Sequence, residues 1–124
     1  MYAIYKKDGI EYTVNGTPAS STPILTSTHD DPVFHTIKIE ENGKGVNFKV
    51  WFTNSGVAYI AGSECYVDGT QVTFDYAVHN PEIYMTRNDP AIGGFREGWF
   101  NIAYKDVANG KHRISGNFRV KINQ

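Results

Sequence analysis

The fold is decided by residues 33–53, which read VFHTIKIEENGKGVNFKVWFT. Apolar and polar side chains alternate on both sides of the turn sequence Asn42-Gly43-Lys44-Gly45. A period of two places the two kinds of side chain on opposite faces of a β-strand. Because an Asn-Gly pair accepts the positive φ angles of a tight hairpin turn, the stretch predicts two antiparallel strands with one buried face each. The side chains expected on the buried faces are Val33, His35, Ile37, Ile39, Val46, Phe48, Val50 and Phe52.

The composition extends this prediction to the whole chain of 124 residues. The chain contains 11 Ile, 10 Val, 8 Tyr and 7 Phe but a single Leu. β-branched and aromatic side chains fit a pleated, half-buried surface, whereas helical proteins favour unbranched Leu. We therefore expect an all-β fold, an antiparallel β-sandwich of the immunoglobulin-like kind, with a small β-barrel as the alternative. Further turn pairs are Asp8-Gly9, Asn15-Gly16, Ser55-Gly56, Asp68-Gly69, Gly93-Gly94 and Asn109-Gly110.

The alternation is less regular in the rest of the chain. Gly62 interrupts its stretch and indicates a bulge or a corner. Residues 79–96 contain two prolines and a Gly-Gly pair, which predicts the longest loop, with one helical turn as an option at residues 81–86. Further strands are expected at residues 57–67, 72–78, 99–107 and 114–122.

The N-terminal part is predicted to form a docking arm. Residues 2–7 and 10–14 are separated by an Asp-Gly pair and predict a short hairpin. An isolated hairpin is marginal in water, so it must pack either on the body of its own domain or on a neighbouring subunit. Residues 15–32 are rich in Ser, Thr and Pro and predict an extended connector, which divides the chain into an arm at residues 1–32 and a β-sandwich domain at residues 33–124. The contact residues expected on the arm are Tyr2, Ile4, Ile10 and Tyr12.

Charge and cysteine content argue against several classes of protein. The chain has 12 basic and 13 acidic residues, a formal net charge of −1, which argues against nucleic-acid binding through bulk charge. It has no run of about 18 apolar residues, so we expect no membrane-spanning helix, and we expect no secretory signal. The single Cys65 rules out an intrachain disulfide. We expect no cofactor.

One short segment has the residue types of a metal site. His29, Asp30 and Asp31 are followed by His35, which places two imidazoles and two carboxylates within seven residues. A structural zinc site needs fixed tetrahedral ligands, and no further Cys or His lies at ligand spacing. The sequence therefore favours an Asp-rich loop ahead of a strand, with His35 on the apolar face of that strand, and we assign no metal ligand.

Acid–base and nucleophilic catalysis are not favoured either. Glu40 and Glu41 are adjacent in a predicted strand, so they point to opposite faces and cannot act as a pair. Cys65 lies in a predicted strand, with no helix N-terminus to activate its thiol. Ser55 lies in a turn rather than in a strained elbow. We assign no catalytic residue and expect that the chain is not an enzyme.

Aromatic residues outside the core pattern are the candidate recognition residues. Trp51 falls on the polar face of its predicted strand. Exposed rings stack on sugars, and large aromatics also anchor protein interfaces, while the alternative is that part of this set is ordinary core. The basic side chains near the C-terminus are expected to form a solvated outer face. The full recognition set is Trp51, Tyr59, Tyr66, Tyr84 and Phe95.

The segment 37–78 carries a family resemblance. It contains Glu40-Glu41-Asn42-Gly43, the strand 46–52, the turn Asn54-Ser55-Gly56 and then Asp68-Gly69-Thr70 ahead of another strand. This order resembles the N-terminal immunoglobulin-like module of phage baseplate upper proteins and related virion domains, over about a third of the chain.

The resemblance has one departure and one further match. The usual Asp-Leu-Thr-Gly-Ala run of that module is replaced by Tyr-Ile-Ala-Gly-Ser at residues 59–63. Residues 110–120 resemble the closing strand of sandwich modules. The family has no catalytic residues to carry over to this chain.

The resemblance implies a non-enzymatic structural or interaction protein of a phage virion, in the baseplate, tail or capsid. Its expected partners are other copies of itself and other virion proteins, and its expected location is the virion, after synthesis in the host cytoplasm. A carbohydrate-binding module that uses exposed aromatics, with a host-surface glycan as its partner, is the first alternative. A small phage-encoded inhibitor of a host defence enzyme is the second.

Overall fold

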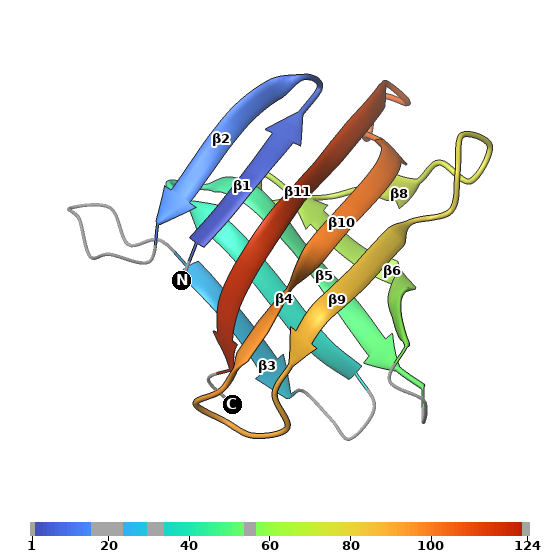
Figure 1. Ribbon diagram of the computed structural model, residues 1–124. Coiled ribbons are helices and arrows are strands. Elements are labelled where there is room, and N and C mark those ends of the chain that lie inside the picture. The colour runs from blue at the N-terminus through green and yellow to red at the C-terminus, as the bar shows by residue number, and fades with distance from the viewer. Residues whose placement is uncertain (1, 16–23, 30–33, 54–56, 123–124) are drawn as a thin grey trace.

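A computed structural model describes residues 2–15, 24–29, 34–53 and 57–122 of the chain. These residues form two antiparallel sheets packed face to face (Figure 1). The strands of the two layers run in crossing directions, which is the orthogonal way of packing sheets. The front sheet consists, in spatial order, of β2 (Ile10–Asn15), β1 (Tyr2–Lys7), β11 (Lys111–Ile122), β10 (Phe95–Lys105) and β9 (Glu82–Asn88), with the short β8 (Thr73–Phe74) also on β10. The back sheet consists of β3 (Ile24–His29), β4 (Phe34–Glu41), β5 (Lys44–Phe52), β6 (Ala58–Val67) and β7 (Thr70–Gln71).

Strand β11 joins the two sheets. One of its edges pairs with β10 along nearly its whole length, from Lys111 to Lys121. Its other edge pairs with β1 from Ile114 to Arg119 and then, in parallel, with β3 at Lys121 and Ile122. The two sheets therefore share a continuous hydrogen-bonded path that bends at the end of β11.

The core lies between the two layers. The inward side chains of β11 are almost fully buried, and Phe100 of β10 bridges to the back sheet, with its ring centroid 5.3 Å from that of Phe48. The buried core side chains are Ala3, Tyr5, Val14, Ile37, Ile39, Val46, Phe48, Val50, Cys65, Val67, Phe74, Phe100, Ile102, Tyr104, Ile114, Phe118 and Val120.

The prediction of an antiparallel β-sandwich is confirmed, although its immunoglobulin-like detail is not. The alternation that defines β4 and β5 places His35 and Phe48 inside, as expected, but Thr36 on the opposite phase is also buried. Strand β6 bulges, because Phe48 pairs with Cys65 while Val50 pairs with Ile60. The extra residues on β6 include Gly62, where the sequence indicated a bulge.

The prediction of one strand over residues 72–78 is wrong. The chain leaves the back sheet after β7 and enters the front sheet at β8, so the strand is interrupted at Val72. After Phe74 the backbone turns, and the Asp75 carbonyl accepts hydrogen bonds from the N–H groups of Val78 and His79. The alternation of apolar residues over this stretch does not mark one buried face, because the chain turns here from one sheet to the other. Tyr76 and Val78 are both 58% exposed.

The prediction of a loop over residues 79–96, with a helical turn at 81–86, is also wrong. Strand β9 occupies the middle of this stretch and pairs with β10. Ile83 and Met85 are half-buried, whereas Glu82 and Tyr84 are exposed, so the period of two is present. The flanking prolines lie outside the strand and mark its limits.

The N-terminal hairpin packs on its own domain. Strand β1 pairs with β11 over its full length, and Ala3, Tyr5 and Val14 belong to the common core. Tyr12, expected on the contact surface of the arm, stacks on Tyr5 with ring centroids 5.1 Å apart. Within the predicted connector, residues 24–29 form a strand of the back sheet, because they pair with β4 and β11, and residues 16–23 and 30–32 lie outside the described part.

Gly116 permits the close approach of β1 to β11, which leads to a prediction. A Cβ atom at this position would lie 2.5 Å from the carbonyl oxygen of Ile4 and 2.6 Å from the Cβ of Tyr5. Because backbone atoms cannot move aside cheaply, we expect Gly116→Ala to lower the free energy of unfolding by ~1–3 kcal/mol in urea denaturation. The control, Ser115→Ala on the outward face of the same strand, should change it by less than ~0.5 kcal/mol. Equal stability of the two variants would contradict the close packing of the hairpin.

Candidate functional site

The outer face of the front sheet carries a row of side chains that crosses all of its long strands. Strand register places the members of this row beside one another, from β2 through β1, β11 and β10 to β9. Their neighbours along the strands, such as Tyr5, Phe100 and Phe118, point into the core, so the row itself points outward. We name it the aromatic row, and its members are Thr13, Ile4, Asn117, Trp99 and Tyr84.

A second outward row lies two residues further along each strand. It follows the same register across the same strands and consists of polar side chains only. We name it the polar row, and its members are Glu11, Lys6, Ser115, Asn101 and Glu82.

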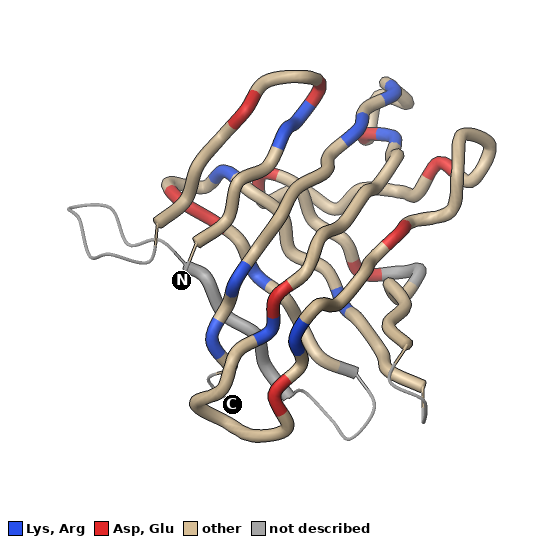
Figure 2. Tube along the Cα trace, viewed as in Figure 1, with Lys and Arg blue, Asp and Glu red and all other residues tan. Residues whose placement is uncertain are grey.

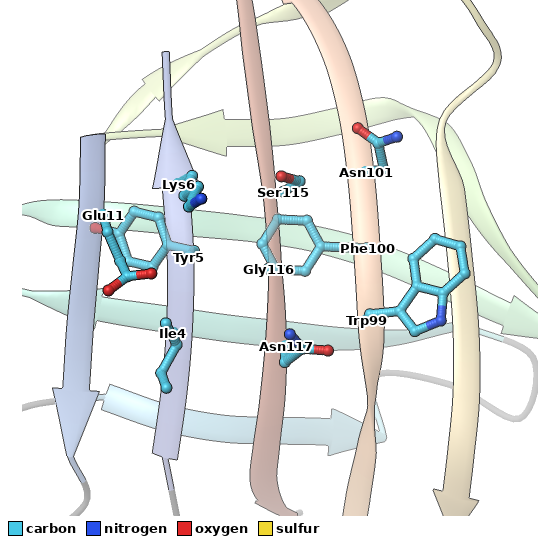
Figure 3. A pocket seen from close by; sticks show the side chains of 10 residues that line it. All are labelled: Ile4, Tyr5, Lys6, Glu11, Trp99, Phe100, Asn101, Ser115, Gly116 and Asn117. Atoms are coloured by element: carbon cyan, nitrogen blue, oxygen red, sulfur yellow. The ribbon is translucent and has the colours of Figure 1, made fainter. Parts of the chain in front are cut away.

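A shallow groove of about 360 Å³ lies along the two rows (Figure 3). Its lining includes Ile4, Asn117 and Trp99 of the aromatic row and Glu11, Lys6, Ser115 and Asn101 of the polar row. Ile4 and Lys6 line it from β1, and Trp99 and Asn101 line it from β10. Gly116 of β11, which has no side chain, lies between them. Ser115 and Asn117, on either side of Gly116, are the side chains that β11 contributes to the groove.

Trp99 forms one end of the groove, and Tyr84 lies beside it on the neighbouring strand. Their rings are nearly parallel, with 18° between the planes and 6.0 Å between the centroids. Trp99 is 39% exposed and Tyr84 is 58% exposed. Two large, flat and accessible ring surfaces thus lie next to each other on neighbouring strands.

Hydrogen bonds fix part of the polar row. The Asn101 side-chain amide donates to Glu82 Oε1 at 3.1 Å, and its Oδ1 accepts from Arg113 Nε at 2.9 Å. Within the part of the chain that the structure describes, the side chains of Ser115 and Asn117 make no hydrogen bond. The amide of Asn101 is therefore held in one orientation, while the amide of Asn117 and the hydroxyl of Ser115 remain available in the groove.

Charged residues lie mostly at the two ends of the front sheet, as Figure 2 shows. The central strands carry no Lys, Arg, Asp or Glu over residues 98–104 and 114–118. At one end, Phe95 lies against two guanidinium groups, those of Arg119 at 4.4 Å and Arg87 at 5.5 Å from the ring centroid. The groove therefore has uncharged lining residues on β10 and β11, and its charged lining residues, Lys6 and Glu11, belong to the hairpin.

The recognition residues predicted from the sequence are divided between the two faces of the sandwich. Trp51 stacks on Tyr59 with a centroid distance of 4.7 Å, on the outer face of the back sheet. Tyr66, 37% exposed, lies on β6 of the same sheet. Only Tyr84 belongs to the aromatic row, and Phe95 lies among the charges at the end of the front sheet. The structure thus brings together Trp51 and Tyr59, but it separates them from Tyr84.

Trp99, Asn101 and Asn117 were not singled out in the sequence as recognition residues. A usable signal was present, because Trp99 is in phase with the polar Asn101 and out of phase with Phe100. Asn117 is likewise exposed, and it is out of phase with the buried Phe118 that follows it. The strand register that places these residues beside Tyr84 could not be predicted from the sequence.

A histidine links two turns at one end of the front sheet. His112 Nδ1 lies 2.6 Å from Asp8 Oδ2, and His112 Nε2 lies 2.6 Å from Asp106 Oδ2. Since both ring nitrogens face carboxylates, the ring is held as an imidazolium, and the hydrogen bonds with Asp106 and then Asp8 raise the pKa of His112. Beside it, Lys7 Nζ forms a 2.6 Å ion pair with Asp68 of the back sheet. These contacts connect the turn between β1 and β2 to the front sheet through His112 and to the back sheet through Asp68.

Cys65 lies in the core and is 1% exposed. Burial raises the pKa of its thiol to about 12, so the thiol stays protonated at neutral pH. Among the described residues, no group of three or more His, Cys, Asp and Glu side chains is arranged to hold a metal ion. Of the metal candidate from the sequence, Asp30 and Asp31 lie outside these residues, as does the side chain of His29.

Comparison of the chain with protein-family models, with curated proteins and with solved structures gave no match. Over the residues that the structure covers, no helix has the length and apolar character needed to cross a membrane.

The raised pKa of His112 predicts how stability depends on pH. A group whose pKa is higher in the folded state stabilises it fully below the unfolded value of about 6.5 and loses this contribution as the pH rises through the folded value. The difference in Tm between the native chain and His112→Ala should therefore be largest at about pH 6 and below, and it should shrink as the pH is raised from there into the alkaline range. The control Thr13→Ala, which removes an exposed side chain without an ionisable group, should keep the pH dependence of the native chain. A difference that stays constant across this range would show that His112 acts through packing alone.

Proposed function

We propose that this chain is a non-enzymatic carbohydrate-binding module and that the groove on the front sheet is its binding surface. The observation that carries the proposal is the pair of exposed, nearly parallel rings of Trp99 and Tyr84 beside the uncommitted side chains of Asn117 and Ser115. Flat apolar surface next to a few placed polar groups is the usual composition of a small-molecule site.

The chemistry of a sugar matches these two surfaces. One face of a pyranose ring presents C–H groups, which pack on an aromatic ring, while its hydroxyls need donors and acceptors around the rim. Asn117 supplies an amide with both kinds of group, and Ser115 supplies a hydroxyl. The rings would therefore provide apolar contact, and Asn117 and Ser115 would orient the hydroxyls.

The shape of the groove supports binding rather than catalysis. Hydrolysis of a glycosidic bond needs two carboxyl groups at a defined separation around the bond, and a site from which bulk water is excluded. The groove is shallow, and of its lining residues only Glu11 carries a carboxylate. Glu82, at its border, already accepts a hydrogen bond from Asn101.

The two tryptophans provide a matched test, because they lie on opposite faces of the sandwich. On a glycan array, and then by calorimetry with the best array sugar, Trp99→Ala should lower the affinity about tenfold or more, which corresponds to ~1.4 kcal/mol. Trp51→Ala removes an equal ring from the back sheet and should leave the affinity unchanged. Circular dichroism would establish that both variants are folded. Binding that depends on Trp51 and not on Trp99 would contradict the proposed surface, and a chain without any sugar ligand would contradict the function.

A second proposal is an assembly role, as a structural component of a phage particle. It is supported by the edge strand β2, which pairs with β1 alone among the described strands. Ile10 at the start of β2 is 61% exposed, and Ile4 and Tyr2 on β1 are 40% and 42% exposed. An unpaired strand edge with exposed apolar side chains beside it is a template for adding a strand from another copy.

Light scattering after size exclusion separates the two proposals. If the chain assembles through β2, it should form a closed oligomer, and Ile10→Lys should shift it to monomer because a buried unpaired charge opposes edge contact. Glu11→Lys, which changes charge on the outward side of the same strand, is the control for a general charge effect. A native chain that stays monomeric at all accessible concentrations would contradict the assembly role.

A further inference from the structure

We infer that the groove binds an interior segment of a linear, uncharged polysaccharide, which lies across the strands of the front sheet along the aromatic row. The inference rests on the proposed carbohydrate-binding function and adds the class of sugar, its direction and the part of the chain that is recognised.

The direction follows from the strands that contribute to the groove. Its lining side chains come from β2, β1, β11 and β10, with Glu11 at one end and Trp99 at the other. Tyr84 on β9 continues the aromatic surface in the same direction, since it pairs with Trp99. Adjacent strands are ~4.8 Å apart, so the row from β2 to β9 is ~19 Å long, which accommodates several sugar units rather than one.

Recognition of an interior segment follows from how the row ends. It begins at Thr13 on β2 and finishes at Tyr84 on β9. Each of these strands has one partner strand within the described residues, so both are borders of the front sheet. A site that recognises a chain terminus needs a group that blocks the path, whereas a row that runs from border to border lets a polymer continue at both ends.

The preference for uncharged sugar follows from the balance of charge in the groove. Lys6 and Glu11 are the charged lining residues and sit opposite each other on β1 and β2. Nearby, Asn101 bridges Glu82 and Arg113, again one charge of each sign. A uronate or sulfate group would meet equal numbers of like and opposite charges and gain little net attraction.

Asn117 is the central contact in this arrangement. It lies in the aromatic row between Ile4 and Trp99, on β11, which crosses the middle of the groove. Its amide both donates and accepts, and each sugar hydroxyl does the same, so one Asn can satisfy one hydroxyl in both senses or two adjacent hydroxyls. A charged side chain at this position could offer only one of the two roles.

The test is a calorimetric series with linear oligosaccharides of increasing length from cellulose, xylan and mannan, together with oligogalacturonates as the acidic counterpart. Affinity for one uncharged series should rise with each added unit and level off once the oligomer spans the ~19 Å row. Reduction of the chain end to the alditol should leave the affinity of the longest oligomer unchanged. Added salt should also leave it unchanged, because no ion pair contributes.

Asn117→Ala should lower the affinity for the longest oligomer about tenfold, as expected for loss of a buried hydrogen bond. The matched control is Asn47→Ala, which removes the same amide from the back sheet and should change nothing. The outcomes separate the inference from the function on which it rests. If no saccharide binds, both fail. If a saccharide binds through Trp99 but monomer and long oligomer bind equally, or end reduction abolishes binding, or the oligogalacturonate binds best, then the function stands and the inference is overturned.

Discussion

The rest of the structure depends on the pairing of β11. This strand has β10 along one edge and β1 followed by β3 along the other. Because hydrogen bonds at its end continue into the back sheet, the position of one strand determines how the two layers meet. Its inward side chains, including Ile114 and Phe118, are almost completely buried, so a shift by one residue would expose them to water.

The same register produces the candidate site. With Phe118 directed into the core, Asn117 must point outward, and pairing with β10 and β9 then aligns it with Trp99 and Tyr84. The burial that stabilises the fold and the order of side chains on the outer face of the front sheet are therefore two consequences of one alignment. The hairpin completes the groove from the other side, and contacts at its turn, from Lys7 to Asp68 and from Asp8 to His112, hold it in place.

Local features were predictable from the sequence, and long-range pairing was not. The alternation in β4 and β5 and their connecting turn depend on neighbouring residues, so their prediction is confirmed. Strand β9 was missed because its identity as a strand depends on β10, and the interruption at Val72 follows from a change of sheet that alternation cannot show. Tyr84 and Trp51 were predicted as recognition residues and Trp99 was not, and the grouping of Tyr84 with Trp99 rather than with Trp51 is a property of the register.

The central claim is that recognition occurs on the outer face of the front sheet. The chain has two tryptophans, Trp99 on that face and Trp51 on the opposite one, so its NMR spectrum contains one indole N–H signal from each face. The most direct measurement is a titration of the native chain with the uncharged oligosaccharide that binds best, followed through these two signals. We predict that the Trp99 signal shifts to saturation together with the side-chain amide of Asn117, while the Trp51 signal stays in place. A titration that shifts the Trp51 signal and leaves Trp99 and Asn117 unchanged would contradict the claim.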